Sequence, residues 1–100
     1  MNMESIREDE TLNVSLAETL DISTVQSLHA EFQAALEGGD PIHLHGSAVE
    51  RVDTAALQVL AAMFIYAAEH QGKLEMHSPS EALVHSAMLL GMVGHIGLNN

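Results

Sequence analysis

Cysteine is absent from this sequence, which excludes a disulfide framework and any metal site built on thiolates. Aromatic residues make up only 3% of the chain, so its core has to be built from aliphatic side chains and methionine. Basic residues are scarce too: three Lys and Arg stand against fourteen Asp and Glu, giving a formal net charge of −11. Nucleic acid is therefore not expected as a partner, because its phosphates are bound through Lys and Arg. The acidity favours solubility or, alternatively, a steered encounter with a basic partner surface.

Long hydrophobic runs are missing as well. The longest apolar window, residues 59–68, is far shorter than the roughly 20 residues of a membrane-spanning helix. The N-terminal residues lack the apolar run behind a basic end that marks a signal peptide. We expect a cytoplasmic protein with no direct membrane insertion, and a single domain over residues 1–100.

Hydrophobic periodicity predicts the secondary structure. Strands are predicted where polar and apolar residues alternate, at residues 12–16, 41–45 and 73–77, with a short edge strand at 4–7. Helices are predicted where apolar stripes recur at helical spacing, at residues 24–37, 54–70 and 79–90. Alternating strands and helices are typical of an α/β fold, so we predict a mixed four-stranded sheet with crossover helices.

Capping residues mark the starts of the first and third helices. Ser23 with Gln26 fits a capping box. Ser78 is the expected cap of the third helix, with Pro79 at the first helical position and Glu81 completing a second capping box.

The helix over residues 54–70 is predicted to be the central one. It is apolar almost all round, so we expect burial on most of its surface, with Leu60 and Phe64 in the core. Asp53 is the expected N-cap. The helix start, Asp53-Thr54-Ala55-Ala56, combines small side chains with free backbone N–H groups, and it is where we place a functional site.

Histidines offer candidate metal ligands that share a face. His43 and His45 lie two residues apart on a predicted strand, so both imidazoles project from one side, and His77 on a neighbouring strand could add a third zinc ligand. No H-E-x-x-H pattern supports such a site. Surface histidines on an open sheet face are the simpler interpretation, and we predict no metal and no cofactor.

Catalytic motifs are missing. The sequence has no G-x-S-x-G elbow, and Ser47 and Ser86 have no neighbouring residues that would activate them. Gly38 and Gly39 do not form a phosphate loop, because no Lys-Ser/Thr pair follows. We therefore predict no catalytic residues and no enzyme activity.

The residues V-D-T-A-A-L-Q-V-L, at positions 52–60, follow a predicted strand and loop. In that setting they resemble the signature of STAS domains (sulfate transporter and anti-sigma-factor antagonist). Leu20-Asp21 before the first helix, Gly72-Lys73-Leu74 opening a strand, and Gly91 closing the third helix agree with it. The resemblance spans residues 12–98 and implies a stand-alone bacterial STAS protein with the anti-sigma-factor-antagonist-like fold.

The resemblance implies a regulatory module that binds a protein partner, an anti-sigma factor or kinase-like protein, through Asp53, Thr54, Ala55 and Ala56. In anti-sigma-factor antagonists this helix start reads Asp-Ser-Ser-Gly, and a partner kinase phosphorylates the second Ser, which adds charge to the interface. Ala55 stands at that position here and has no hydroxyl. Thr54 matches the first Ser but points about 100° away. We expect signal transduction by binding, without the usual phosphoserine.

Two alternatives remain open. The small cytoplasmic STAS subunit of the phospholipid-trafficking (Mla-type) ABC transporter bears Asp-Thr-Ala here, with the Thr at the contact with the ATPase subunit. Asp53-Thr54-Ala55 matches it residue for residue, which implies an accessory subunit that binds the transporter ATPase. The second alternative is a chemotaxis-associated STAS protein, or a ligand- or metal-binding module that uses the histidine face.

Five further apolar residues are expected in the core rather than at a contact: Met63, Tyr66, Met88, Met92 and Val93. Any of them that is exposed would extend the partner surface between the central and third helices.

Overall fold

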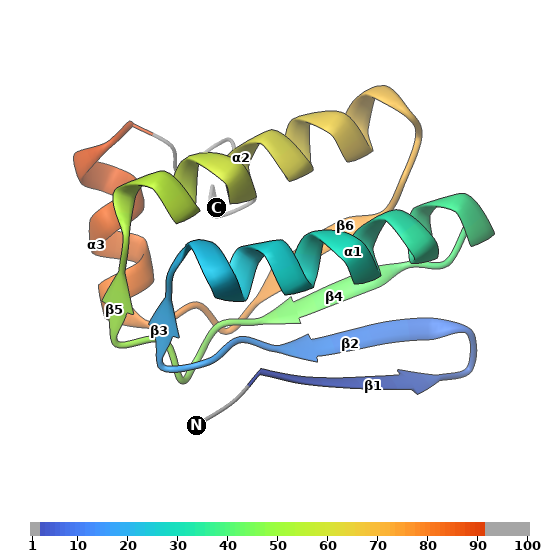
Figure 1. Cartoon of the computed structure of the whole chain (residues 1–100), viewed down its shortest axis with the longest axis horizontal. Coiled ribbons are helices and arrows are strands. Elements are labelled where there is room, and N and C mark those ends of the chain that lie inside the picture. Colours follow the sequence, from blue (N-terminus) through green and yellow to red (C-terminus); the bar gives the residue numbers. More distant parts are fainter. Residues whose placement is uncertain (1–2, 92–100) are drawn as a thin grey trace.

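Four strands form the main sheet of the computed structural model, which describes residues 3–91 (Figure 1). They are β1 (Glu4–Glu8), β2 (Thr11–Ser15), β4 (Ile42–His45) and β6 (Leu74–His77), in the order β1-β2-β4-β6. β1 runs antiparallel to β2, whereas β2, β4 and β6 are parallel. The predicted mixed four-stranded sheet is therefore confirmed.

The edge strand β1 is joined to β2 by a tight turn. Asp9 and Glu10 have positive φ angles of 49° and 63°, the backbone that a two-residue hairpin turn of type I′ requires. Leu12 and Val14 on β2 are buried while Thr11, Asn13 and Ser15 between them are not. The alternation that predicts this strand therefore sets which face it presents to the core.

Helices α1 (Ile22–Gly38) and α2 (Thr54–Glu69) connect β2 to β4 and β4 to β6, and both lie on the same side of the sheet (Figure 1). The third described helix, α3 (Glu81–Leu89), lies at one end of the α1–α2 layer. Each helix begins and ends within two residues of its predicted range. In the part of the chain that the structure describes, no helix covers the opposite face of the sheet. None of these helices has both the length and the apolar character needed to cross a membrane.

A second, two-stranded sheet was not expected from the sequence. β3 (Thr19–Leu20) and β5 (Arg51–Val52) pair in parallel, although both lie outside every predicted strand. Two residues are too few to show a hydrophobic period, so this pairing leaves no signal in the sequence. Each strand leads directly into a helix, and their pairing brings the starts of α1 and α2 to the same end of the molecule (Figure 1).

Two predicted helix caps are wrong by two residues. Asp21, not Ser23, caps α1, because its carboxylate accepts the backbone N–H of Thr24 at 3.0 Å. Ser80, not Ser78, caps α3 by accepting the backbone N–H of Leu83 at 3.1 Å. The tertiary structure selects among the candidate caps: β3 ends immediately before Asp21, and the Ser80 N–H is held by the carbonyl oxygen of Gly46 at 3.0 Å.

The core lies between the main sheet and the α1–α2 layer. Its largest fully buried side chains are Phe32, Leu16, Leu20, Leu28, Ile42, Leu44, Leu57, Leu60, Leu83, Val14 and Val25. Phe32 is the one aromatic residue in that set, as the composition predicts.

Helix α2 is buried along one face only, so the expected burial on most of its surface is wrong. Leu60 is fully buried, but Phe64 is only half-buried. Val59, Ile65 and Tyr66 are exposed by 36%, 46% and 45%. An apolar sequence shows that a helix can be buried all round; whether it is depends on how many elements pack against it.

Candidate functional site

Asp53 caps the start of α2, as predicted. Its carboxylate oxygen Oδ1 accepts hydrogen bonds from the backbone N–H of Ala55 at 2.8 Å and of Ala56 at 3.4 Å. Its backbone is extended (φ −81°, ψ 134°), the usual geometry of a capping residue. The carboxylate therefore satisfies two N–H groups that the first helical turn cannot pair internally.

Backbone hydrogen bonds to Glu18 and to β3 fix where α2 begins. The N–H groups of Glu50 and Arg51 both donate to the carbonyl oxygen of Glu18, at 2.7 and 3.0 Å. The N–H of Asp53 donates to the carbonyl oxygen of Leu20 at 2.9 Å. None of these bonds uses a side chain, so the position of the helix start does not depend on which small side chains the first turn carries.

The four predicted site residues divide into two groups. Asp53, Thr54 and Ala55 are exposed, whereas Ala56 is fully buried. The side chain of Ala56 therefore packs in the core and is not available to a partner. The accessible part of the site consists of the first three residues.

The start of α1 lies beside this site. The Asp21 carboxylate accepts the Thr24 backbone N–H, and also the hydroxyls of Ser23 and Thr24, each at 2.9 Å. These bonds, the Thr24 backbone bond first among them, hold the pKa of Asp21 below its ordinary value, because they stabilise the ionised carboxylate. The starts of α1 and α2, each capped by an aspartate, therefore lie close together.

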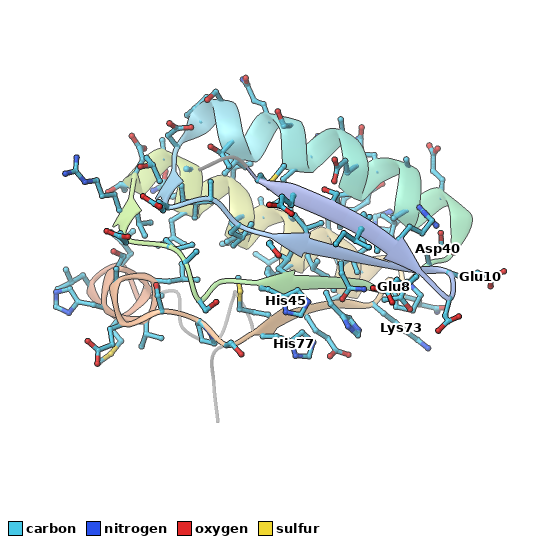
Figure 2. The ribbon with its side chains drawn as sticks, turned by 90° about the horizontal axis from the view of Figure 1, so that it is seen from below. Glu8, Glu10, Asp40, His45, Lys73 and His77 are labelled. Atoms are coloured by element: carbon cyan, nitrogen blue, oxygen red, sulfur yellow. The ribbon has the colours of Figure 1, made fainter. Side chains whose placement is uncertain are left out.

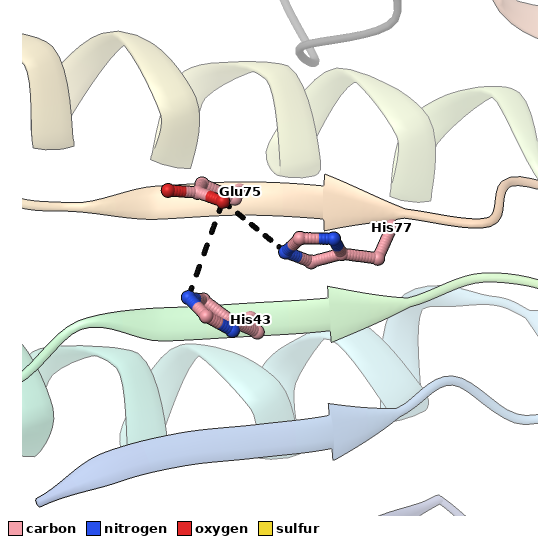
Figure 3. Close-up of side chains that lie close together, drawn as sticks. All are labelled: His43, Glu75 and His77. Carbon is pink, nitrogen blue, oxygen red and sulfur yellow. Dashed lines mark ion pairs between the residues drawn. The ribbon is translucent and has the colours of Figure 1, made fainter.

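The predicted histidine face is present on the other side of the sheet, with one change in its members. His43 and His77 come together with Glu75, which sequence reasoning missed, and their ligand atoms all lie within 4.8 Å of one another (Figure 3). His45 instead lies 3.0 Å from the side-chain oxygen of Asn13 through its Nε2 atom. Glu75 is a polar residue of a short strand, and a carboxylate there is common on a sheet surface. Its position beside His43 follows only from the register of β4 and β6.

A sequence model of the family described as "Mlab, STAS domain" matches residues 4–98 of this chain. The chain belongs to the STAS domain family. Among curated proteins, none matches it in sequence. The predicted resemblance of the chain to STAS domains is thereby confirmed.

Similar solved structures have the same fold. An anti-sigma-factor antagonist (STAS) domain protein from Planctomyces limnophilus superposes with a TM-score of 0.71 at 17% sequence identity, covering 94% of this chain and 86% of that one. The protein TM1081, solved by NMR, also gives a TM-score of 0.71, at 18% identity over 92% of this chain and 75% of its own. STAS domains are generally non-enzymatic regulatory modules that interact with protein partners.

An exposed apolar stripe on α2 includes Tyr66, which sequence reasoning considered as a possible contact, and Val59 and Ala62, which it missed. Val59 lies one turn after Ala55, and Ala62 and Tyr66 follow along the same side of the helix. Beside them, a groove of about 220 Å³ between α1 and α2 is lined by His29, Phe32, Gln33, Val59, Ala62, Met63 and Tyr66. The apolar sequence of α2 leads us to expect burial. The same sequence also suits a helix that packs one face on the core and leaves another face open to a partner.

The five apolar residues expected in the core have different surroundings. Met63 is buried, at 2% exposure, while Tyr66 and Met88 are exposed by 45% and 64%. Leu89 and Leu90, at the end of α3, are also exposed. Met92 and Val93 lie outside the described residues.

Proposed function

We propose that this STAS domain is a non-enzymatic, cytoplasmic regulatory module that binds a protein partner through the exposed start of α2. Asp53, Thr54 and Ala55 form the centre of the proposed contact. The buried side chain of Ala56 packs this turn against the core. The observation that carries this proposal is the combination of exposed small side chains with a backbone fixed by hydrogen bonds to β3. A surface of that kind is ordered before the partner arrives, which lowers the entropy cost of binding.

The exposed stripe of α2 supports the same site. Val59 and Tyr66 continue the surface of Ala55 along the helix, and Tyr66 packs its ring edge-on against Phe32 with ring centroids 6.2 Å apart. Aromatic residues are enriched at the centre of protein interfaces, where charged residues are depleted. The partner surface of this proposal therefore begins at the helix start and continues along one side of α2.

Partner binding in this proposal is not switched by a phosphoserine. The methyl group of Ala55 is exposed at the position where anti-sigma-factor antagonists carry that residue. The module, anti-sigma-factor-antagonist-like in its fold, would then bind its anti-sigma factor or kinase-like partner constitutively or be tuned by another input.

An accessory subunit of a Mla-type ABC transporter is the second candidate function, with the ATPase subunit as partner. Two observations favour it: the match of Asp53-Thr54-Ala55 to that branch, and the description of the matching family as "Mlab, STAS domain". Both candidates use the same surface and differ only in what binds to it.

Pull-down from the native host, followed by identification of the bound proteins, tests both candidates. Thr54→Glu should reduce recovery of the partner at least tenfold, because an anion placed in the contact loses its hydration. The fold should survive, since a helix N-terminus tolerates negative charge. Thr54→Ala should cost about 1 kcal/mol of unfolding free energy or less.

Gln26→Glu is the matched control, because it adds the same charge at an exposed position of α1. It should recover the partner as the wild type does. Recovery of an anti-sigma factor or kinase supports the first candidate, and recovery of an ABC transporter ATPase supports the second. Equal recovery by wild type and Thr54→Glu would mean that the partner binds elsewhere.

A further inference from the structure

Two adjacent strands present a row of ligand-forming side chains on the face of the sheet opposite α1 and α2. In the parallel register of β4 and β6, His43 pairs with Glu75 and His45 with His77. Because strand residues alternate between faces, all four side chains project to the same side, which Figure 2 views directly with His45 and His77 labelled. Leu44 and Met76, between them, project toward the core cluster.

One distance in the cluster is that expected between two ligands of one metal ion, and the others are longer. Nε2 of His77 lies 3.2 Å from Oε1 of Glu75, and Nε2 of His43 lies 4.0 Å from the same oxygen (Figure 3). Two ligand atoms of a tetrahedral zinc ion, at bond lengths of about 2.0–2.2 Å, are roughly 3.4 Å apart. The Glu75–His77 pair already has this separation, whereas His43 would have to move closer to share an ion with them.

Nε2 of His77 is shielded from solvent, although 39% of the His77 side chain is accessible. Among the described residues, it is the one buried side-chain nitrogen or oxygen without a hydrogen-bond partner. Glu75 lies close enough to form an ion pair with it, but not in the orientation of a hydrogen bond. Buried polar atoms without a partner cost free energy, and a cation held by the carboxylate and both imidazoles would satisfy this one.

Neighbouring rings restrain the cluster. The ring of His77 is stacked on that of His45, with centroids 5.4 Å apart and an angle of 25° between the planes. His45 is itself held by Asn13, at 3.0 Å. His43 contacts His77 from the other direction, with ring centroids 4.7 Å apart. These ring contacts restrict the two histidine ligands, whose side chains are 32% and 39% accessible to solvent.

We propose that His43, Glu75 and His77 form a site for a divalent transition-metal ion of the zinc type. Two imidazole nitrogens and one carboxylate oxygen, without thiolate, suit Zn²⁺, whereas Mg²⁺ prefers oxygen ligands alone. Three protein ligands leave the fourth tetrahedral position to water or to a group from outside the chain. The site is on the opposite side of the sheet from the proposed partner surface, so it stands independently of it.

Calorimetric titration of the chelator-treated full chain with Zn²⁺ tests the site. We expect one saturable Zn²⁺ per chain and no comparable binding of Mg²⁺. Glu75→Gln and His77→Gln should each weaken Zn²⁺ binding more than about tenfold, because each removes one ligand of three. Glu75 is largely exposed, with 58% of its side chain accessible, so its substitution by the isosteric Gln leaves the fold intact.

His85→Gln is the matched control, because it removes an exposed imidazole on α3 and should leave Zn²⁺ binding unchanged. Titration with Co²⁺ adds a spectroscopic readout, since a tetrahedral site gives intense visible absorption that should disappear in Glu75→Gln. Absence of saturable Zn²⁺ binding by the wild type would overturn the proposal and leave the cluster as a surface ion pair. Undiminished binding by both Glu75→Gln and His77→Gln would also overturn it, because the metal would then be held elsewhere on the chain.

Discussion

Neighbouring residues of α2 differ widely in their exposure to solvent. Leu60 is completely buried, Phe64 is half-buried, and Val59 is exposed by 36%. Thr54 and Ala55, at the start of the same helix, are exposed as well. Substitutions along a single helix can therefore separate the contribution of a side chain to stability from its contribution to a surface contact.

Leu60→Ala should lower the free energy of unfolding by about 2–5 kcal/mol, because it leaves a cavity in a small core. Phe64→Ala should cost less than Leu60→Ala, since part of the Phe64 ring is already in water. Val59→Ala is the control and should stay within about 0.5 kcal/mol of the wild type. Urea unfolding measures all three. A larger loss for Phe64→Ala than for Leu60→Ala would mean that the buried face of α2 is assigned wrongly.

At the scale of elements, the structure depends on how the helices begin. α1, α2 and α3 each start at a side chain that accepts a backbone N–H of the first turn: Asp21, Asp53 and Ser80. The first two of these caps follow the paired strands β3 and β5 directly, so the small sheet and the caps act together to fix both helix starts.

Asp53→Ala should lower the free energy of unfolding by about 1 kcal/mol, because two backbone N–H groups of α2 lose their acceptor. Asp53→Asn keeps a side-chain oxygen at the same place and should lose much less. Thermal unfolding followed by circular dichroism compares the two variants. Equal losses for Ala and Asn would show that the hydrogen bonds of the cap contribute nothing and that only the charge matters.

Asp21 makes the free energy of unfolding depend on pH in the acidic range. Its folded-state pKa lies below the ordinary value of 3.8, chiefly because of the Thr24 backbone N–H and then the Ser23 and Thr24 hydroxyls. Its contribution is therefore complete above the unfolded-state pKa, and it is lost as the pH falls through the lower folded-state pKa. Asp21→Asn, which cannot titrate, should lose less stability than the wild type on acidification below about pH 4. Parallel curves for both proteins in urea unfolding at a series of acidic pH values would contradict this.

The spacing of apolar residues predicts the longer helices and strands, because an element that buries one face must carry apolar residues at its own structural period. The alternation of Leu12 and Val14 with polar residues predicts β2, and the apolar stripe of α1 includes the buried residues Val25, Leu28, Phe32 and Ala35. β3 and β5 are too short to carry any period, and their pairing is stabilised by backbone groups that every residue has. The caps of α1 and α3 could not be predicted because several residues near each start are able to cap, and long-range hydrogen bonds select one.

At the scale of the whole molecule, the main sheet separates two surfaces of different chemistry. The helical side carries the start of α2 and its exposed apolar stripe. The opposite side carries His43, His45, Glu75 and His77, of which His45 and His77 are labelled in Figure 2. The net charge of −11 belongs to the whole chain and does not by itself identify a partner for either surface.

Sequence reasoning could predict the centre of the candidate site but not its extent. The Asp53 cap and the small residues after it are local features of the sequence. Whether Ala56 faces inward and Val59 and Tyr66 face outward depends on how α2 sits against α1 and the sheet, which no local pattern specifies. The same holds for Glu75, whose neighbours are set by the register between β4 and β6.

The proposed function rests on the binding of a protein partner at the start and along the exposed side of α2. Its most direct test is to map backbone amide NMR shifts of the isotope-labelled protein on addition of the partner recovered by pull-down. We expect the largest changes at Thr54, Ala55, Val59 and Tyr66, and little change at His43, Glu75 and His77. Changes confined to the sheet face of β4 and β6, with the amides of α2 unaffected, would contradict the account.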